Sequence, residues 1–207
     1  DKLNARIDNP SVIISGGDGI GEHPTQALLD MFTILDQKQR IDNLTITMVG
    51  DLRHGRTVHS LAKLIARYEA QNVRLCFVSP ESLKMPSEII QLLNRQGDTV
   101  YETADLMEVL GQSDVIYWTR VQEERFKDNP SDYEAIKDDF IMTPDVLSHA
   151  KANAILMHPL PRKHEMGTRQ DHDILDEDPR AVYFEQMENG MLVRMALLAK
   201  VLRGAYI

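Results

Sequence analysis

The chain has 207 residues, of which 43% are hydrophobic and 27% charged, and its formal net charge is −9. This composition is typical of a globular protein and excludes a disordered or low-complexity chain. The acidic balance argues against a nucleic-acid binder, because neutralising phosphates requires clustered Lys and Arg.

The single cysteine, Cys76, excludes an internal disulfide and suits a reducing compartment. No apolar run approaches the ~20 residues of a membrane helix. The first residues also lack the apolar core of a signal peptide. We therefore expect a soluble, cytoplasmic protein without a membrane partner.

Short apolar and β-branched runs alternate with helical patterns along the chain, and each run is too short for a helix. The predicted strands are Val12–Ser15, Leu44–Val49, Val73–Val78, Thr99–Glu102, Val115–Trp118 and Ile155–Met157.

Helical patterns separate these runs. Pro24 suits the first turn of a helix, Thr57 suits the cap of a second, and Pro86 opens a third. A last helix is expected from about Ala181 to Arg203. Its methionines recur at helical spacing, which is typical of a core-facing stripe.

Alternation of helices with nearly all-apolar strands predicts an α/β fold: a doubly wound, five-stranded parallel sheet with helices on both faces. Residues 44–158 supply the five strands. Val12–Ser15 is either an edge strand of this sheet or the final strand of a domain whose earlier part is not in this chain.

Polar loops follow several strands, at the ends where parallel sheets bind ligands. The loop Gly50–Thr57 has two glycines and opens directly into a helix, so Arg56 stands where an anion would bind. The spacing is close to a phosphate loop, but Arg replaces the usual Lys, and a planar guanidinium suits a carboxylate. No apolar strand ends in an Asp that would hold Mg²⁺, which disfavours nucleotide hydrolysis. A surface Arg beside a structural turn is the alternative.

Two later loops also carry arginines. Alternation sends Arg120 and Gln122 to the same side after the strand that ends at Trp118. The segment His158–Arg162 holds two prolines, which leave rigid carbonyls able to accept from a ligand. Taken alone, Arg120 is equally well interpreted as a solvated surface charge, and the proline-containing segment as an ordinary turn. Arginines at three strand ends predict an anion between them.

A glycine-rich segment, Gly16–Gly21, leads into the helix that begins near Pro24. His23 can donate to a carbonyl oxygen there, and Gln26 can accept from an amide. The alternative is that His23 only caps the helix. Spacing of the other histidines predicts no metal site. Cys76 reads as a core residue, and the acidic stretch 171–178 as a solvated loop.

In their order, these motifs resemble those of the transcarbamoylase family, in its aspartate-using branch. The matching segments are His23–Asp30, Gly50–Leu61, Thr119–Gln122 and His158–Arg162, with further similarity at Glu188–Met191. The resemblance implies transfer of a carbamoyl group from carbamoyl phosphate to the α-amino group of L-aspartate. The products are N-carbamoyl-L-aspartate and phosphate, in pyrimidine biosynthesis, and no cofactor or metal is expected.

The resemblance also implies roles for individual residues. The catalytic residues would be His23, which polarises the carbonyl oxygen, and Arg56. Binding of carbamoyl phosphate would fall to His23, Gln26 and the carbonyls of Leu160 and Pro161; binding of aspartate to Arg56, Arg120 and Gln122. Arg125 and Arg162 would support these groups without contacting the substrates themselves. An ornithine-type transcarbamoylase is the alternative, although two guanidiniums suit a dicarboxylate and that branch typically has Cys where Pro159 stands. A non-catalytic binding module is another.

The family's first portion carries a phosphate site, a mobile-loop lysine and a further arginine that have no counterpart here. By resemblance, residues 1–40 are a remnant of the carbamoyl-phosphate domain, 41–180 the aspartate-binding domain, and 181–207 a helix returning toward the first domain. Such a chain is expected to be inactive alone and to expose apolar side chains on its two terminal helices. The expected set is Leu28, Met31, Phe32, Leu35 and part of the stripe Met191, Met195, Leu198 and Leu202. Full-length members form homotrimers, sometimes with regulatory chains or fused pyrimidine-pathway domains.

Overall fold

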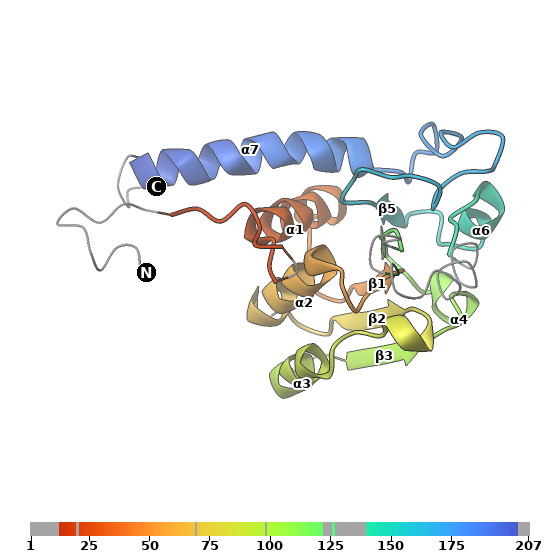
Figure 1. Ribbon diagram of the computed structural model, residues 1–207, viewed down its shortest axis with the longest axis horizontal. Coiled ribbons are helices and arrows are strands. Elements are labelled where there is room, and N and C mark those ends of the chain that lie inside the picture. The colour runs from red at the N-terminus through yellow and green to blue at the C-terminus, as the bar shows by residue number, and fades with distance from the viewer. Residues whose placement is uncertain are drawn as a thin grey trace.

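The computed structural model describes residues 13–19, 21–68, 70–97, 99–121, 126 and 140–202. Its centre is a five-stranded sheet in the order β3-β2-β1-β4-β5, and every neighbouring pair is parallel (Figure 1). The strands are β1 Thr45–Val49, β2 Arg74–Val78, β3 Thr99–Thr103, β4 Val115–Trp118 and β5 Ile155–Met157. The predicted doubly wound sheet is confirmed, with five of the six predicted strands in it.

Helices connect the strands and cover the sheet. They are α1 Pro24–Lys38, α2 Arg56–Tyr68, the 3₁₀ turn η2 Glu81–Leu83, α3 Ser87–Gln96, α4 Met107–Leu110, α6 Pro144–Ser148 and α7 Tyr183–Leu202. The first turn of α2 already begins at Arg56, so the expectation that Thr57 caps this helix is wrong. The short elements η2, α4 and α6 escaped sequence analysis because they span too few residues to show a helical period.

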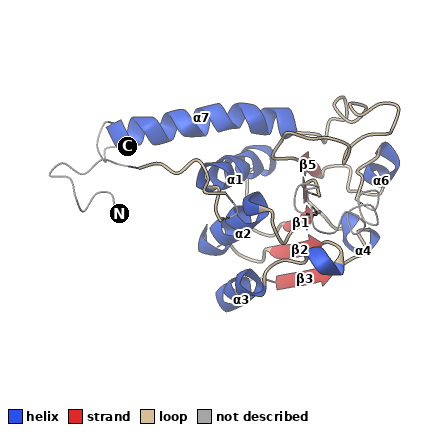
Figure 2. Cartoon of the chain, in the orientation of Figure 1, coloured by secondary structure: helices blue, strands red, loops and turns tan. Residues whose placement is uncertain are grey.

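Strands β1, β2, β4 and β5 are buried on both faces, whereas the edge strand β3 is largely exposed. On one face, Ile34 of α1, Leu61 of α2 and Leu93 of α3 pack with strand residues such as Ile46. On the other face, a second core unites strand residues with α4, α6 and the first residue of α7. Figure 2 shows α1, α2 and α3 on one side of the strands and α4 and α6 on the other. This arrangement explains why the strands are almost continuously apolar, and Cys76 lies in the second core as predicted.

Residues 13–15 of the predicted first strand lie outside the sheet, and Val12 is outside the described residues. The edge-strand interpretation is therefore wrong for these three residues. Ile13 leaves 59% of its surface exposed, so this segment lacks the sheet contacts that hold a buried strand in place.

Helix α7 lies along α1 and continues beyond it (Figure 1). Its apolar stripe is exposed, with Met187 at 57%, Met191 at 63% and Met195 at 58%. The interpretation of the methionines as core residues is thus wrong, because only the opposite side of α7 faces the domain. The expected exposure of the stripe Met191, Met195, Leu198 and Leu202 is confirmed. On α1, Leu28 and Phe32 are exposed as expected.

The expected exposure of Met31 is wrong. Met31 is 5% exposed and belongs to the core formed by α1, α2 and the sheet. Leu35 is half-buried and packs against the same core. Among the helices that the structure describes, none is long and apolar enough to cross a membrane.

Candidate active site

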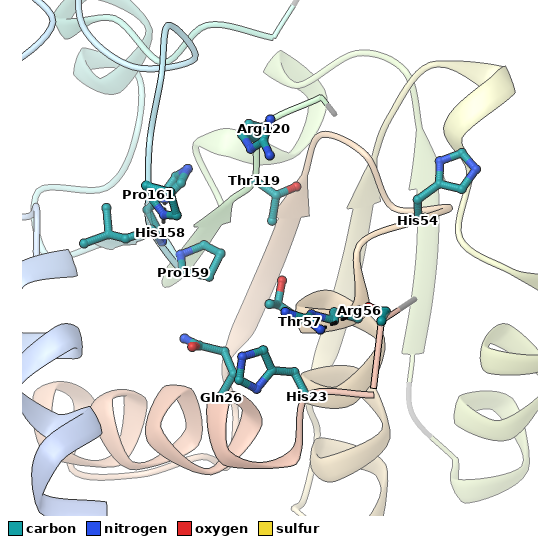
Figure 3. Close-up of a pocket in the computed structure, with 12 residues that line it drawn as sticks. His23, Gln26, His54, Arg56, Thr57, Thr119, Arg120, His158, Pro159 and Pro161 are labelled. Carbon is teal, nitrogen blue, oxygen red and sulfur yellow. Dashed lines mark hydrogen bonds between the residues drawn. The ribbon is translucent and has the colours of Figure 1, made fainter. Parts of the chain in front are cut away.

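A pocket of about 340 Å³ opens at the carboxyl ends of β1, β4 and β5, beside the start of α1 (Figure 3). The order of strands reverses between β1 and β4, which is where doubly wound sheets bind ligands. The volume suits a small molecule. The lining residues are Gly19, His23, Gln26, His54, Arg56, Thr57, Thr119, Arg120, His158, Pro159, Leu160 and Pro161.

Six residues singled out from the sequence line this pocket together: His23, Gln26, Arg56, Arg120, Leu160 and Pro161. Gln122 and Arg125 lie outside the described residues. Sequence reasoning missed His54, Thr57, Thr119 and His158 as lining residues. Each of them lies in a loop or at a strand end that the sequence had already indicated as a ligand site. Their closeness in sequence to the predicted site residues was the signal that could have identified them.

Gly50 allows the loops after β1 and β4 to meet. Its φ is +115°, in the region that favours glycine, and a Cβ there would lie 2.2 Å from the carbonyl oxygen of Thr119. The next residue, Asp51, is fully buried and orients the loop. Its Oδ1 accepts from the His54 N–H at 2.9 Å and lies 3.1 Å from His54 Nδ1.

Arg56 begins α2 and reaches back to the glycine-rich segment. Its Nη1 donates to the carbonyl oxygen of Gly19 at 3.1 Å. A Cβ on Gly17 would lie 2.9 Å from the same nitrogen, so the chain wraps closely around the guanidinium. Arg120 follows β4 across the pocket and is half-buried. Two arginines from neighbouring strand ends therefore contribute positive charge to one pocket.

His23 precedes α1, and its backbone N–H donates to Ser60 Oγ of α2 at 2.9 Å. Its side chain makes no cap hydrogen bond, so the interpretation as a mere helix cap is wrong. Burial, together with the positive charges of Arg56 and Arg194, lowers the pKa of His23. The imidazole is therefore neutral at pH 7 and carries one N–H. Its Nδ1 is buried and has no hydrogen-bond partner within the described part of the chain.

The backbone of the loop after β5 is hydrogen-bonded to a side chain of the loop itself. Leu160 has φ +47°, and the Leu160–Pro161 peptide is cis. His158 Nδ1 accepts from the Leu160 N–H at 2.9 Å, which places the imidazole proton on Nε2, 3.0 Å from Glu165 Oε1. Burial is the largest influence on the pKa of Glu165 and raises it, but the interaction with His158 and the backbone N–H groups of Glu165 and Lys163 together lower the pKa overall. His158 thus braces the loop from within.

Arg162 turns away from the pocket. It contacts Asp173 at 2.8 Å, binds Asp176, and donates to the Tyr183 hydroxyl at 2.9 Å. Of the two or three arginines expected to converge, Arg56 and Arg120 line the pocket, and Arg162 is held by the acidic stretch 171–178. That stretch is correspondingly not a wholly solvated loop, because Asp176 is half-buried.

The family profile described as "Aspartate/ornithine carbamoyltransferase, Asp/Orn binding domain" matches residues 42–201. The chain belongs to the aspartate/ornithine carbamoyltransferase family. It is 53% identical over 189 residues to the multifunctional protein pyr1-3 of Dictyostelium discoideum, covering 91% of this chain and 8% of that protein. It is 46% identical over 192 residues to a chloroplastic aspartate carbamoyltransferase of Arabidopsis thaliana, covering 93% of this chain and 47% of that protein.

Solved structures agree with this family and fold. The catalytic subunit of M. jannaschii aspartate transcarbamoylase superposes with a TM-score of 0.80 at 41% identity, covering 91% of this chain and 58% of that one. Trypanosoma cruzi aspartate transcarbamoylase, in complex with N-(phosphonacetyl)-L-aspartic acid, gives 0.79 at 42% identity, covering 89% and 57%. This chain thus spans about half the length of these single-enzyme relatives.

Proposed function

We propose that this chain supplies the aspartate-binding half of an aspartate carbamoyltransferase. The reaction joins the carbamoyl group of carbamoyl phosphate to the α-amino nitrogen of L-aspartate, giving N-carbamoyl-L-aspartate and phosphate in pyrimidine biosynthesis. The observation that carries the proposal is the presence of Arg56 and Arg120 in one pocket. Two guanidinium forks match the two carboxylates of aspartate in charge and in geometry.

The chemistry requires polarisation of a carbonyl group. The amino nitrogen bonds to the carbonyl carbon, the bond from that carbon to the phosphate oxygen breaks, and the nitrogen releases a proton. His23, neutral because of burial and nearby arginines, donates its N–H to the carbonyl oxygen. This hydrogen bond strengthens as negative charge develops on that oxygen. Positioning of the two substrates supplies the remainder.

The carbamoyl NH₂ group needs acceptors. Gln26 lines the pocket at the start of α1, and Leu160 and Pro161 line it after β5. Figure 3 shows Pro161 across the pocket from Gln26. Both prolines of that loop restrict the backbone and so hold the carbonyls in place. We assign these three groups to the carbamoyl NH₂, and we keep Gln122 as a supporting contact to aspartate.

Ornithine is the competing amine, since the family description covers both substrates. Its side-chain ammonium would meet the positive charges of Arg56 and Arg120, whereas aspartate would neutralise them. The Trypanosoma cruzi relative was crystallised with carbamoyl phosphate and aspartate bound, which supports the same choice. The alternative of a non-catalytic binding module differs from both transcarbamoylases in one measurable respect: it would turn over neither amine.

Further features of the parent protein are proposed on the family alone. They are assembly into a homotrimer, association with regulatory chains or fusion to other pyrimidine-pathway domains, and the division 1–40, 41–180 and 181–207. The Dictyostelium relative is a multifunctional protein, which supports fusion as one form. A cytoplasmic location also stays a prediction, because the Arabidopsis relative is chloroplastic. Light scattering and cell fractionation test these points.

The test compares two proteins: the 207-residue chain, and an "extended chain" in which the N-terminal portion of the Arabidopsis relative is joined to it. The 207-residue chain should bind N-(phosphonacetyl)-L-aspartate in calorimetry and turn over little substrate. The extended chain should consume L-aspartate and carbamoyl phosphate, with the intact Arabidopsis enzyme as assay control. A folded extended chain that consumes L-ornithine instead, or neither amine, contradicts the proposal.

A further inference from the structure

Asp30 is a carboxylate that the chemistry above does not use, although it is fully buried in the middle of α1. It accepts three hydrogen bonds: from Gln26 Nε2 at 2.9 Å, from Gln186 Nε2 at 2.6 Å, and from the Tyr117 hydroxyl at 2.7 Å. These partners come from α1, α7 and β4. No basic side chain is among them, so Asp30 has three hydrogen-bond partners but no ion-pair partner among the described residues.

One of these partners lines the pocket. Gln26 and Asp30 stand four residues apart on α1, so they share a face of the helix. Because one amide N–H of Gln26 is bound to Asp30 Oδ1, the orientation of the amide is fixed. The side-chain oxygen of Gln26 is then the atom that can accept from a ligand in the pocket.

The second partner reaches the opposite wall. Gln186 is 1% exposed, and its Oε1 accepts from the His158 N–H at 2.9 Å, where β5 ends and the loop to Pro161 begins. With Nε2 bound to Asp30, Gln186 has its oxygen pointing at His158. A flipped amide would place N–H against N–H at His158 and leave Asp30 facing an oxygen. The carboxylate therefore selects the amide orientation on both sides.

We propose that Asp30 is a positioning residue that aligns the acceptors for the carbamoyl NH₂ group on both walls of the pocket, through Gln26 on one side and through Gln186 and His158 on the other. This role rests on the proposed function, because the proposed function identifies the carbamoyl NH₂ group as the donor that these acceptors bind. A buried carboxyl group without an ion-pair partner lowers the stability of the folded state compared with an apolar residue. That cost is consistent with a side chain retained for orientation.

The experiment compares variants of the α1–α7 interface in the extended chain. Asp30→Leu removes all three hydrogen bonds. Gln186→Met removes the bridge from Asp30 to His158 and leaves the hydrogen bonds from Gln26 and Tyr117 to Asp30 in place. Asp30→Asn is the rescue: its oxygen can accept from both glutamines while its NH₂ donates to the Tyr117 oxygen. The matched control is Thr33→Val, which breaks the buried hydrogen bond from Asn189 Nδ2 to Thr33 Oγ1 in the same interface. That bond touches no lining residue of the pocket.

Two readouts separate positioning from stability. The first is hydrogen exchange at the His158 amide. The second compares the change in KM for carbamoyl phosphate with the change in KM for L-aspartate. Asp30→Leu should speed exchange at His158 and raise KM for carbamoyl phosphate about tenfold, the loss expected for one or two hydrogen bonds, with KM for L-aspartate little changed. Gln186→Met should show the same pattern more weakly, and Asp30→Asn and Thr33→Val should stay near the parent protein.

The proposal is overturned if Asp30→Leu and Gln186→Met change thermal stability alone, or if both KM values rise equally. It is also overturned if exchange at His158 matches that of Thr33→Val. Should Asp30→Leu fail to fold, Gln186→Met and Asp30→Asn decide the outcome. Failure of the proposed function looks different: the parent extended chain has no turnover, while hydrogen exchange still reports whether Asp30 holds the loop.

Discussion

The guanidinium of Arg162 and the carboxylate of Asp176 form a two-pronged ion pair, with Nη1 on Oδ1 and with Nη2 2.6 Å from Oδ2. Both side chains are largely removed from solvent, at 14% and 24% exposure. Tyr183, the first residue of α7, donates its hydroxyl to the same carboxylate. The pair thus ties the segment after β5 to the start of α7.

We predict that Asp176→Asn lowers the free energy of unfolding by about 1.5–3 kcal/mol, the range for hydrogen bonds to charged groups. Hydrogen bonding from Arg162 is the main cause that lowers the pKa of Asp176. The stabilisation is therefore present above the unfolded-state pKa and is lost as pH falls through the folded-state value. Urea unfolding at neutral and acidic pH measures both effects. The exposed neighbour Glu177 provides the control Glu177→Gln, and equal losses from both variants would contradict this account.

Gly50→Ala should be strongly destabilising. The new Cβ would lie 2.2 Å from the carbonyl oxygen of Thr119, and φ at +115° is unfavourable for alanine. Strain and overpacking together should cost about 2–4 kcal/mol. Gly16→Ala is the control, since a Cβ there meets nothing within 4 Å. Denaturant unfolding of the two variants decides the point: a loss below about 1 kcal/mol for Gly50→Ala would show that the loops after β1 and β4 separate easily.

The sheet was predictable because four of its strands, β1, β2, β4 and β5, are buried on both faces and their sequences are short apolar runs. The positions where the strands end were predictable from the same runs. Because parallel strands end at one edge of the sheet, these positions indicated that Arg56 and Arg120 lie in one place. Residues outside the sheet were harder. Arg162 follows a strand just as Arg120 does, and only the fold shows that Asp176 takes it away from the pocket.

The periodicity of α7 was readable, but its partner was not. A stripe of methionines has the same spacing whether it faces a core or solvent, and in this chain it faces solvent. The buried network around Asp30 was equally hidden. Gln186 and Asp30 are 156 residues apart, and nothing local in the sequence indicates that they meet.

Arg120→Ala and His23→Ala should affect the extended chain in different ways. Loss of Arg120 removes a charge-assisted contact worth about 1.5–3 kcal/mol, so KM for L-aspartate should rise at least tenfold. Loss of His23 removes a hydrogen bond that strengthens with the developing oxyanion, so kcat should fall by roughly 10²–10³. Steady-state kinetics with each substrate varied separately measures both. A His23→Ala enzyme with altered KM and unchanged kcat would contradict the assigned role.

The last prediction concerns the pH dependence of stability and the charge of Asp30. Burial raises the pKa of Asp30 to about 7 from an ordinary value of 3.8, although the hydrogen bonds from Tyr117, Gln186 and Gln26 act in the opposite direction. Between these two values the folded state holds a proton that the unfolded state has released. Asp30 therefore makes the protein more stable as pH falls from 8 toward 4, opposite in sign to Asp176.

Comparison with Asp30→Asn isolates this contribution, because the other titrating groups are common to both proteins. Relative to the variant, the parent protein should gain about 2 kcal/mol in free energy of unfolding between pH 8 and pH 5.5. Urea unfolding of the 207-residue chain at the two pH values measures the gain. A difference between the two proteins that does not change with pH would mean that Asp30 keeps one protonation state across the range. A difference that grows with pH in favour of the parent would mean that the three hydrogen bonds outweigh burial and hold the pKa of Asp30 below its ordinary value.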